Sequence, residues 1–367
     1  MVRRSAEAFT LAVLVTLVAS CRPGTAQALS PQAPSPAPSA GAPVPSSPGG
    51  QAITALNAAR LVRIASLDLP ASFVNAVTFS PDGRSLVTGD RYGEVLVWER
   101  GTWSRRSYQM PLTTRQAADS ARVPFYGVLA LSPDGRTVVT GGGPEGEVEV
   151  RDWEGRARFT LSYGVPIFAT AVSPDGRFLA VGGMRGNIVV HDLATGQRAA
   201  DLRCDREYVS VLVFSPDGNT LVAGYERPGN LMKAWSTTTW QEAFTFNQMT
   251  ERIDYHDAVF TPDGRQLVIG RIPADIEFVD MGTKQVVRQL RGHTSAPYQL
   301  ALSPDGSLLA SAADDGTVRL WDARSGNAVR VIDTGDHELY SVAFSPDGTL
   351  LAFSVSGEGV QVWAVAR

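Results

Sequence analysis

One tetrapeptide, Ser-Pro-Asp-Gly, recurs through most of this chain and limits what it can fold into. It occurs seven times, once with Thr in place of Ser, and its aspartates are Asp82, Asp134, Asp175, Asp217, Asp263, Asp305 and Asp347. Successive copies are 52, 41, 42, 46, 42 and 42 residues apart. A period in the low forties is typical of a β-propeller whose blades each contain four strands.

The tetrapeptide has the chemistry of a hairpin turn. Pro presets φ at the first central position, Asp accepts hydrogen bonds from nearby backbone amides, and Gly takes a positive φ. Apolar segments flank each copy, as at residues 342–344 and 350–353 around Asp347. The seven aspartates could instead be catalytic or calcium-binding acids, but one copy per unit at the same place favours turn capping. The sequence therefore predicts an all-β fold, a single seven-bladed β-propeller of four-stranded antiparallel blades.

The two ends of the repeat region predict how the ring closes. The chain stops after residues 360–367, which form only the third strand of the seventh unit. An apolar segment at residues 59–67 precedes the first unit and has no place within it. We expect this N-terminal segment to supply the missing fourth strand, which would remove an open sheet edge.

The sixth unit carries a family resemblance. It contains Gly292-His293 and then the run Leu309-Ala-Ser-Ala-Ala-Asp-Asp-Gly-Thr-Val-Arg-Leu-Trp321-Asp322. This unit resembles the WD-repeat family, in which a His, a Ser, an Asp and a Trp form a hydrogen-bonded structural tetrad. The resemblance assigns that tetrad to His293, Ser311, Asp315 and Trp321. The Trp position holds Trp98, Trp235 and Trp363 in three other units, and Arg151, His191 and Val279 in the remaining three.

The same resemblance implies a binding face. In the WD-repeat family the starts of the first strands and the turns between second and third strands line the upper face, where partners dock. Tyrosine and other aromatic side chains suit such a surface. Aromatic residues stand near each first-strand start, including Tyr208 and Tyr255, and Asp314 lies in one of the turns. The candidate partner-binding residues are Phe168, Tyr298, Tyr340, Arg91, Tyr92, Arg185, Tyr225 and Arg227.

The N-terminal region is predicted to lie outside the propeller. Residues 1–20 have a basic head and a short apolar run, typical of a signal peptide, and end at Cys21 in a sequence similar to a bacterial lipobox. An ordinary secretory signal is the alternative. Residues 21–52 are rich in Pro, Ala and Ser and form a disordered tether. Residues 53–367 form the propeller.

Lipidation of Cys21 would place the protein in the cell envelope, with the periplasmic side of the outer membrane favoured by Arg22.

Charge and motifs exclude several function classes. A formal net charge of −4 argues against nucleic-acid binding. The chain shows no recognisable catalytic, phosphate-binding or metal-binding motif, so we expect neither cofactor nor metal. The resemblance to the WD-repeat family implies a non-catalytic scaffold that binds a protein or peptide, and we expect a monomer. The alternatives are a propeller of the Tol-system type, and a hydrolase or quinoprotein-like enzyme with its site in the central channel.

Overall fold

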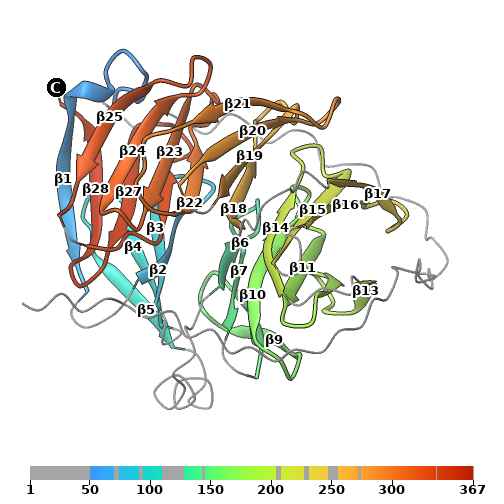
Figure 1. Ribbon diagram of the computed structural model, residues 1–367. Coiled ribbons are helices and arrows are strands. Elements are labelled where there is room, and N and C mark those ends of the chain that lie inside the picture. The colour runs from blue at the N-terminus through green and yellow to red at the C-terminus, as the bar shows by residue number, and fades with distance from the viewer. Residues whose placement is uncertain are drawn as a thin grey trace, which may run out of the picture.

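The computed structural model describes residues 50–69, 74–90, 94–109, 128–142, 145–203, 208–226, 231–246, 255–271, 274–335 and 337–366. These residues form seven four-stranded antiparallel sheets, which are the blades of a propeller (Figure 1). The predicted fold class is therefore confirmed. Within the described ranges no helix has the length and apolar character needed to cross a membrane.

The blades are numbered along the chain, and their strands run from the central channel outward. Blade 1 contains β2 (Val74–Phe79), β3 (Ser85–Asp90), β4 (Glu94–Glu99) and β5 (Arg105–Gln109); blade 2 contains β6 (Val128–Leu131), β7 (Thr137–Gly142), β8 (Glu147–Asp152) and β9 (Ala157–Ser162); blade 3 contains β10 (Ile167–Val172), β11 (Phe178–Gly183), β12 (Asn187–Asp192) and β13 (Arg198–Arg203). Blade 4 contains β14 (Tyr208–Phe214), β15 (Thr220–Glu226), β16 (Leu231–Ser236) and β17 (Glu242–Phe246); blade 5 contains β18 (Tyr255–Phe260), β19 (Gln266–Arg271), β20 (Ile276–Asp280) and β21 (Val286–Leu290). Blade 6 contains β22 (Pro297–Leu302), β23 (Leu308–Ala313), β24 (Thr317–Asp322) and β25 (Ala328–Asp333); blade 7 contains β26 (Val342–Phe344), β27 (Leu350–Val355), β28 (Gly359–Val365) and β1 (Leu61–Asp68).

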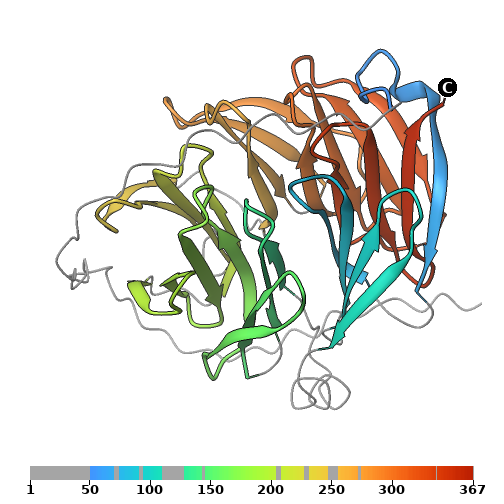
Figure 2. The same cartoon turned by 180° about the vertical axis from the view of Figure 1, so that it is seen from behind.

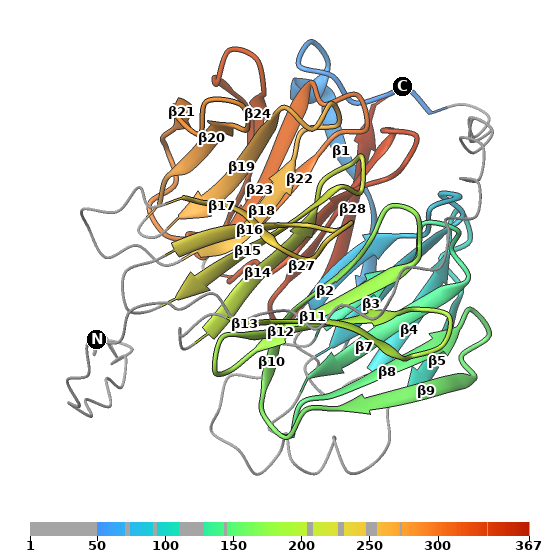
Figure 3. The same ribbon diagram turned by 90° about the vertical axis from the view of Figure 1, so that its right-hand side faces the viewer.

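The inner strands contact one another in sequence around the ring, and β26 of the last blade lies against β2 of the first. Successive blades lie side by side in Figure 3. The core is a set of apolar layers between neighbouring blades. In one such layer Phe278 and Leu290 of blade 5 pack with Leu309 and Trp321 of blade 6. Because neighbouring blades cover both faces of each sheet, the second strands are buried on both sides, as in β7 and β23.

The ring is closed by the N-terminal strand, as predicted. Strand β1 pairs antiparallel with β28 through seven residue pairs, from Leu61 opposite Val365 to Asp68 opposite Gly359. Figures 1 and 2 show β1, in blue, beside the red C-terminal strands. A short 3-10 helix, η1 (Ala58–Arg60), leads into β1, and the Ile53 N–H donates to the Gly348 carbonyl at 2.8 Å. Blade 7 is therefore built from both ends of the propeller.

The repeated tetrapeptides form turns that are braced by their own side chains. In each of the seven, the Ser or Thr hydroxyl donates to the Asp carboxylate at 2.5–2.6 Å. In the fourth turn, hydrogen bonds from the Ser215 hydroxyl and the Asn219 amide hold the pKa of Asp217 below its ordinary value. Gly218 follows with φ of +72°, a conformation that Gly adopts without a Cβ clash. The seven carboxylates thus serve seven separate turns.

A β-bulge recurs at one position of the inner strand in five blades. The strand ladder skips the residue that stands five places before the Ser or Thr of the turn. The skipped residues are Asn75, Phe168, Ser210, His256 and Tyr298. The residue after the bulge pairs with Gly in four of these blades and with Ala in the fifth. A Cβ on Gly182 would lie 2.6 Å from Val209 of the next blade, so close blade packing requires the glycine. A bulge re-aims the side chain of the extra residue.

Candidate interaction face

The propeller has two chemically different faces. The Ser-Pro-Asp-Gly turns join first strands to second strands and lie on what we call the lower face. The opposite, upper face carries the starts of the inner strands and the turns between second and third strands, because consecutive strands run antiparallel. The bulge positions lie at this upper end, next to the mouth of the channel.

Three neighbouring blades contribute aromatic rings to the upper face. The ring centroids of His256 and Tyr298 are 4.7 Å apart, and those of Tyr298 and Tyr340 are 5.4 Å apart, with interplanar angles of 56° and 47°. All three side chains are half-buried. These residues of blades 5, 6 and 7 are called the aromatic arc. Tyr298 and Tyr340 were predicted from the sequence, whereas His256 was not.

The place of His256 follows from the bulge. In blade 5 the sequence shows Tyr255 near the first-strand start and offered no candidate residue, whereas the ladder pairs Tyr255 with Arg271 and skips His256. His256 is five residues before Thr261, the same interval that separates Tyr298 from Ser303 and Tyr340 from Ser345. Counting back from the turn was therefore the signal that could have found it.

Phe168 forms a second, separate aromatic pair. Its ring lies 5.8 Å from that of Tyr208 in an edge-to-face arrangement, between blades 3 and 4. Both side chains are half-buried, and Phe168 occupies the bulge position of its blade. Aromatic side chains therefore reach the upper face on both sides of the channel mouth.

Carboxylates lie beside the aromatic arc. The Tyr340 hydroxyl donates to Glu338, which is exposed. Burial raises the pKa of Tyr340 above its ordinary value, and Glu338, Tyr298 and Asp314 raise it further. Burial also raises the pKa of Asp314, and repulsion from Glu338 and Asp315 adds to this shift. Asp314 and Glu338 are therefore close enough to repel each other across blades 6 and 7.

The other candidate residues of the upper face differ in their positions and exposure. Arg185 is exposed in the turn between β11 and β12, with φ of +74°. Tyr225 was expected in a surface turn, and this was wrong: it lies on β15 opposite Leu231, is fully buried, and packs 6.3 Å from the ring of Trp235. The longer strand places its side chain in the layer between blades 3 and 4. Arg91, Tyr92 and Arg227 lie outside the described residues.

The sixth blade contains a connected chain of hydrogen bonds. The Trp321 indole N–H donates to the Ser311 hydroxyl at 2.9 Å, and that hydroxyl lies 2.7 Å from His293 Nε2. His293 Nδ1 lies 2.9 Å from the Asp315 carboxylate. Burial lowers the pKa of His293 even though Asp315 opposes the shift. Because a carboxylate only accepts, the Nδ1–H of His293 donates to Asp315. The structure thus joins the four residues of the sequence-based tetrad.

In two blades without the full tetrad, the residue at the Trp position has other hydrogen-bond partners. In blade 1 the Trp98 indole N–H donates to the Thr88 hydroxyl at 3.2 Å. In blade 3 His191 replaces the Trp, and its two ring nitrogens lie 3.0 Å from the Tyr163 hydroxyl and 2.9 Å from the Gly196 carbonyl. His191 therefore has a structural setting, with its pKa lowered by burial.

Polar side chains of the inner strands join neighbouring blades. Asp257 accepts the Leu300 N–H at 2.8 Å, and Gln299 accepts the Val342 N–H at 3.0 Å. Ser341 accepts the Val77 N–H at 2.7 Å and also donates to Gln299. These three residues stand four places before their turns, and together they connect blades 5, 6, 7 and 1. In the sequence, a polar residue within an otherwise apolar strand was the signal that could have identified these three positions.

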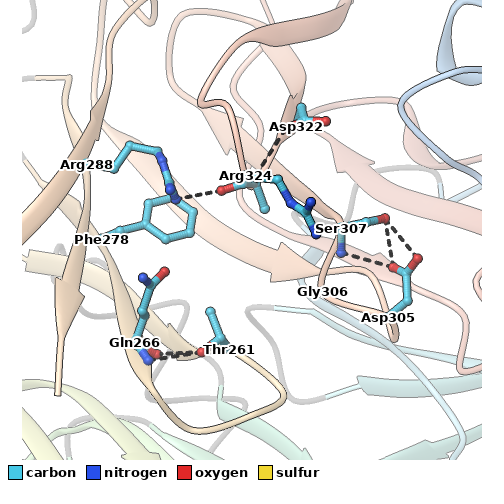
Figure 4. A pocket seen from close by; sticks show the side chains of 10 residues that line it. Thr261, Gln266, Phe278, Arg288, Asp305, Gly306, Ser307, Asp322 and Arg324 are labelled. Carbon is cyan, nitrogen blue, oxygen red and sulfur yellow. Dashed lines mark hydrogen bonds between the residues drawn. The ribbon is translucent and has the colours of Figure 1, made fainter. Parts of the chain in front are cut away.

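A groove of about 470 Å³ lies on the lower face between blades 5 and 6 (Figure 4). Arg288 crosses it, lies 5.0 Å from the Phe278 ring, and donates to the Ala323 carbonyl at 2.6 Å. Ser307 donates to Asp305 within its own turn. The groove is thus lined by groups that brace the two turns. In the part of the chain that the structure describes, no three His, Cys, Asp or Glu side chains are placed to hold a metal ion.

Comparison with known proteins agrees with this architecture. The family model "WD domain, G-beta repeat" matches residues 62–99, 284–322 and 327–363. A similar protein is the "WD repeat-containing protein 26 homolog" of Drosophila melanogaster, 28% identical over 120 residues. That alignment covers 31% of this chain and 18% of the fly protein. Each family match begins in the outer strand of one blade and continues into the three inner strands of the next, so successive blades are interlocked.

Proposed function

From the premise that this chain is a β-propeller built of WD40 repeats, we propose that it is a non-catalytic scaffold that binds a protein partner on its upper face. WD40 propellers are typically protein-interaction scaffolds. The observation that carries the proposal is the aromatic arc, in which His256, Tyr298 and Tyr340 line up across three blades with ring separations of 4.7 and 5.4 Å.

Two features of the face support a binding role. Its aromatic side chains are half-buried, which leaves part of each ring available for contact while the rest is held by packing. Tyrosines fixed in this way supply contact area at a small entropic cost. The lower face, by contrast, presents turns whose carboxylates and hydroxyls are engaged with each other.

Site-specific photocrosslinking in the native host tests this proposal. Benzoylphenylalanine is placed at Arg185 or Glu358 on the upper face, and at Arg136 or Arg324 on the lower face; all four positions are exposed. We expect adducts from the upper positions, and we expect a Tyr298→Ala, Tyr340→Ala double substitution to abolish them. Adducts confined to the lower positions, or unchanged in the double variant, would contradict the proposed face.

We also propose that the propeller is held in the cell envelope by acylated Cys21, on the periplasmic side of the outer membrane. Cys21 lies outside the described residues, and the support is the apolar run and lipobox-like sequence before it. Metabolic labelling with palmitate should mark the wild-type chain and a Cys204→Ser control, which removes the other cysteine. Label that persists in Cys21→Ala would overturn the anchor.

A further inference from the structure

The upper face carries negatively charged side chains next to the aromatic arc. Two carboxylates, Glu338 and Asp314, act on Tyr340 at the blade 7 end of the arc. Glu338 accepts the hydroxyl of Tyr340, and the Asp314 carboxylate accepts the Ser295 hydroxyl at 3.4 Å, three residues before Tyr298. Tilted aromatic rings next to carboxylates therefore span blades 6 and 7.

This combination has a clear electrostatic preference. The faces of aromatic rings carry partial negative charge and attract cations, and the carboxylates add full negative charge. Asp314 and Glu338 are both exposed, so a ligand can reach them, and their mutual repulsion is relieved when a positive group lies between them. An acidic ligand would meet repulsion from both.

We propose that the aromatic arc with Asp314 and Glu338 accepts a Lys or Arg side chain of the partner polypeptide. The inference rests on the proposed function, because it names the chemistry that the same face recognises. A cationic head would lie against the Tyr298 and Tyr340 rings, and its N–H groups would donate to one or both carboxylates. His256 closes the arc on the blade 5 side through its contact with Tyr298.

The test uses the full chain and defined peptide probes at pH 8, where an imidazole is ordinarily uncharged. Four fluorescein-labelled nonapeptide pools are random except for a central Arg, Lys, norleucine or Glu. Fluorescence anisotropy should show the Arg and Lys pools binding about tenfold more tightly than the norleucine pool. The Glu pool should bind most weakly.

Substitutions separate charge from ring contacts. The Asp314→Asn, Glu338→Gln variant should lose the preference for Arg and Lys, so that these pools bind no better than norleucine. The matched control, Glu145→Gln with Glu154→Gln, changes net charge equally at exposed positions on blade 2 and should keep the preference. Tyr298→Phe should also keep it, because the ring remains. Circular dichroism melts show that each variant is folded.

The outcomes distinguish this inference from the function on which it rests. One outcome would overturn only the cation preference. In it, the wild-type protein binds the Arg, norleucine and Glu pools equally well, and the Tyr298→Ala, Tyr340→Ala variant binds all of them more weakly. Failure of every pool to bind, or binding that ignores both tyrosine substitutions, would overturn the upper-face function itself. A preference unchanged in Asp314→Asn, Glu338→Gln would also refute the inference.

Discussion

The carboxylate of Asp257 in blade 5 accepts the backbone N–H of Leu300 in blade 6 at 2.8 Å. Its other oxygen accepts the Ala258 N–H at 2.9 Å. Burial raises the pKa of Asp257 to about 7, although these two hydrogen bonds oppose the shift. A contact that joins two blades therefore depends on a group that is hard to ionise.

This pKa predicts a pH-dependent contribution to stability. The folded chain keeps the Asp257 proton at pH values where the unfolded chain has lost it, so folding is favoured at low pH and this stability is lost as the pH rises from about 4 through about 7. Asp257→Asn cannot ionise. We expect its free energy of unfolding, relative to wild type, to rise between pH 5 and pH 8 in urea titrations. An equal difference at both pH values would contradict the assignment.

The tetrad of blade 6 should contribute strongly to stability. Ser311 is fully buried and is the hydrogen-bond partner of both Trp321 and His293. Ser311→Ala leaves a buried indole N–H without its acceptor, which costs about 1–3 kcal/mol. Urea unfolding followed by circular dichroism measures this loss. The control Ser66→Ala, at an exposed position on β1, should change stability by less than about 0.5 kcal/mol. Equal effects of the two substitutions would show that the tetrad adds nothing.

Removal of the closing strand should destroy the cooperative fold. Strand β1 pairs with β28 along its whole length and buries Leu61 and Leu67. Deletion of residues 53–68 exposes the β28 edge and the layers that these side chains fill, so the calorimetric transition should disappear. Deletion of residues 22–49 keeps every described contact and should leave the melting temperature almost unchanged. A cooperative melt after the first deletion would show that closure is dispensable.

An ion pair reinforces the same closure. Arg100 of blade 1 lies 2.8 Å from Asp347 of blade 7, and it donates to the Thr349 hydroxyl at 2.7 Å. The two charged side chains are only 15% and 10% exposed. Arg100→Met should lower the free energy of unfolding by about 1–3 kcal/mol, because hydrogen bonds to buried charged groups are strong.

The control for this prediction is Arg84, whose guanidinium is 4.0 Å from Asp82 and 81% exposed. Exposed pairs contribute little, so Arg84→Met should be nearly neutral in the same urea titration. A similar loss in both variants would show that removal of a positive charge, and not the contact between blades 1 and 7, causes the effect.

The repeat period and the turn chemistry were enough to predict the seven blades, and the unpaired apolar segment before the first repeat was enough to predict ring closure. These features are encoded locally, because a Ser-Pro-Asp-Gly turn braces itself and an apolar strand must be covered. The tetrad could be located for the same reason: the spacing from His293 to Trp321 follows the family pattern within one repeat.

The composition of the upper face was decided by the tertiary structure. Tyr225 looked like a turn residue but is buried between blades, and His256 joins the arc because a bulge turns it away from the ladder beside Tyr255. Asp314 and Glu338 are neighbours only because blades 6 and 7 adjoin. Which side chains meet across blades depends on strand register and bulges, and a one-residue shift in either reverses the direction of a side chain. The sequence alone therefore determined the ring and its turns, and only the packing of one blade on the next determined which residues face a partner together.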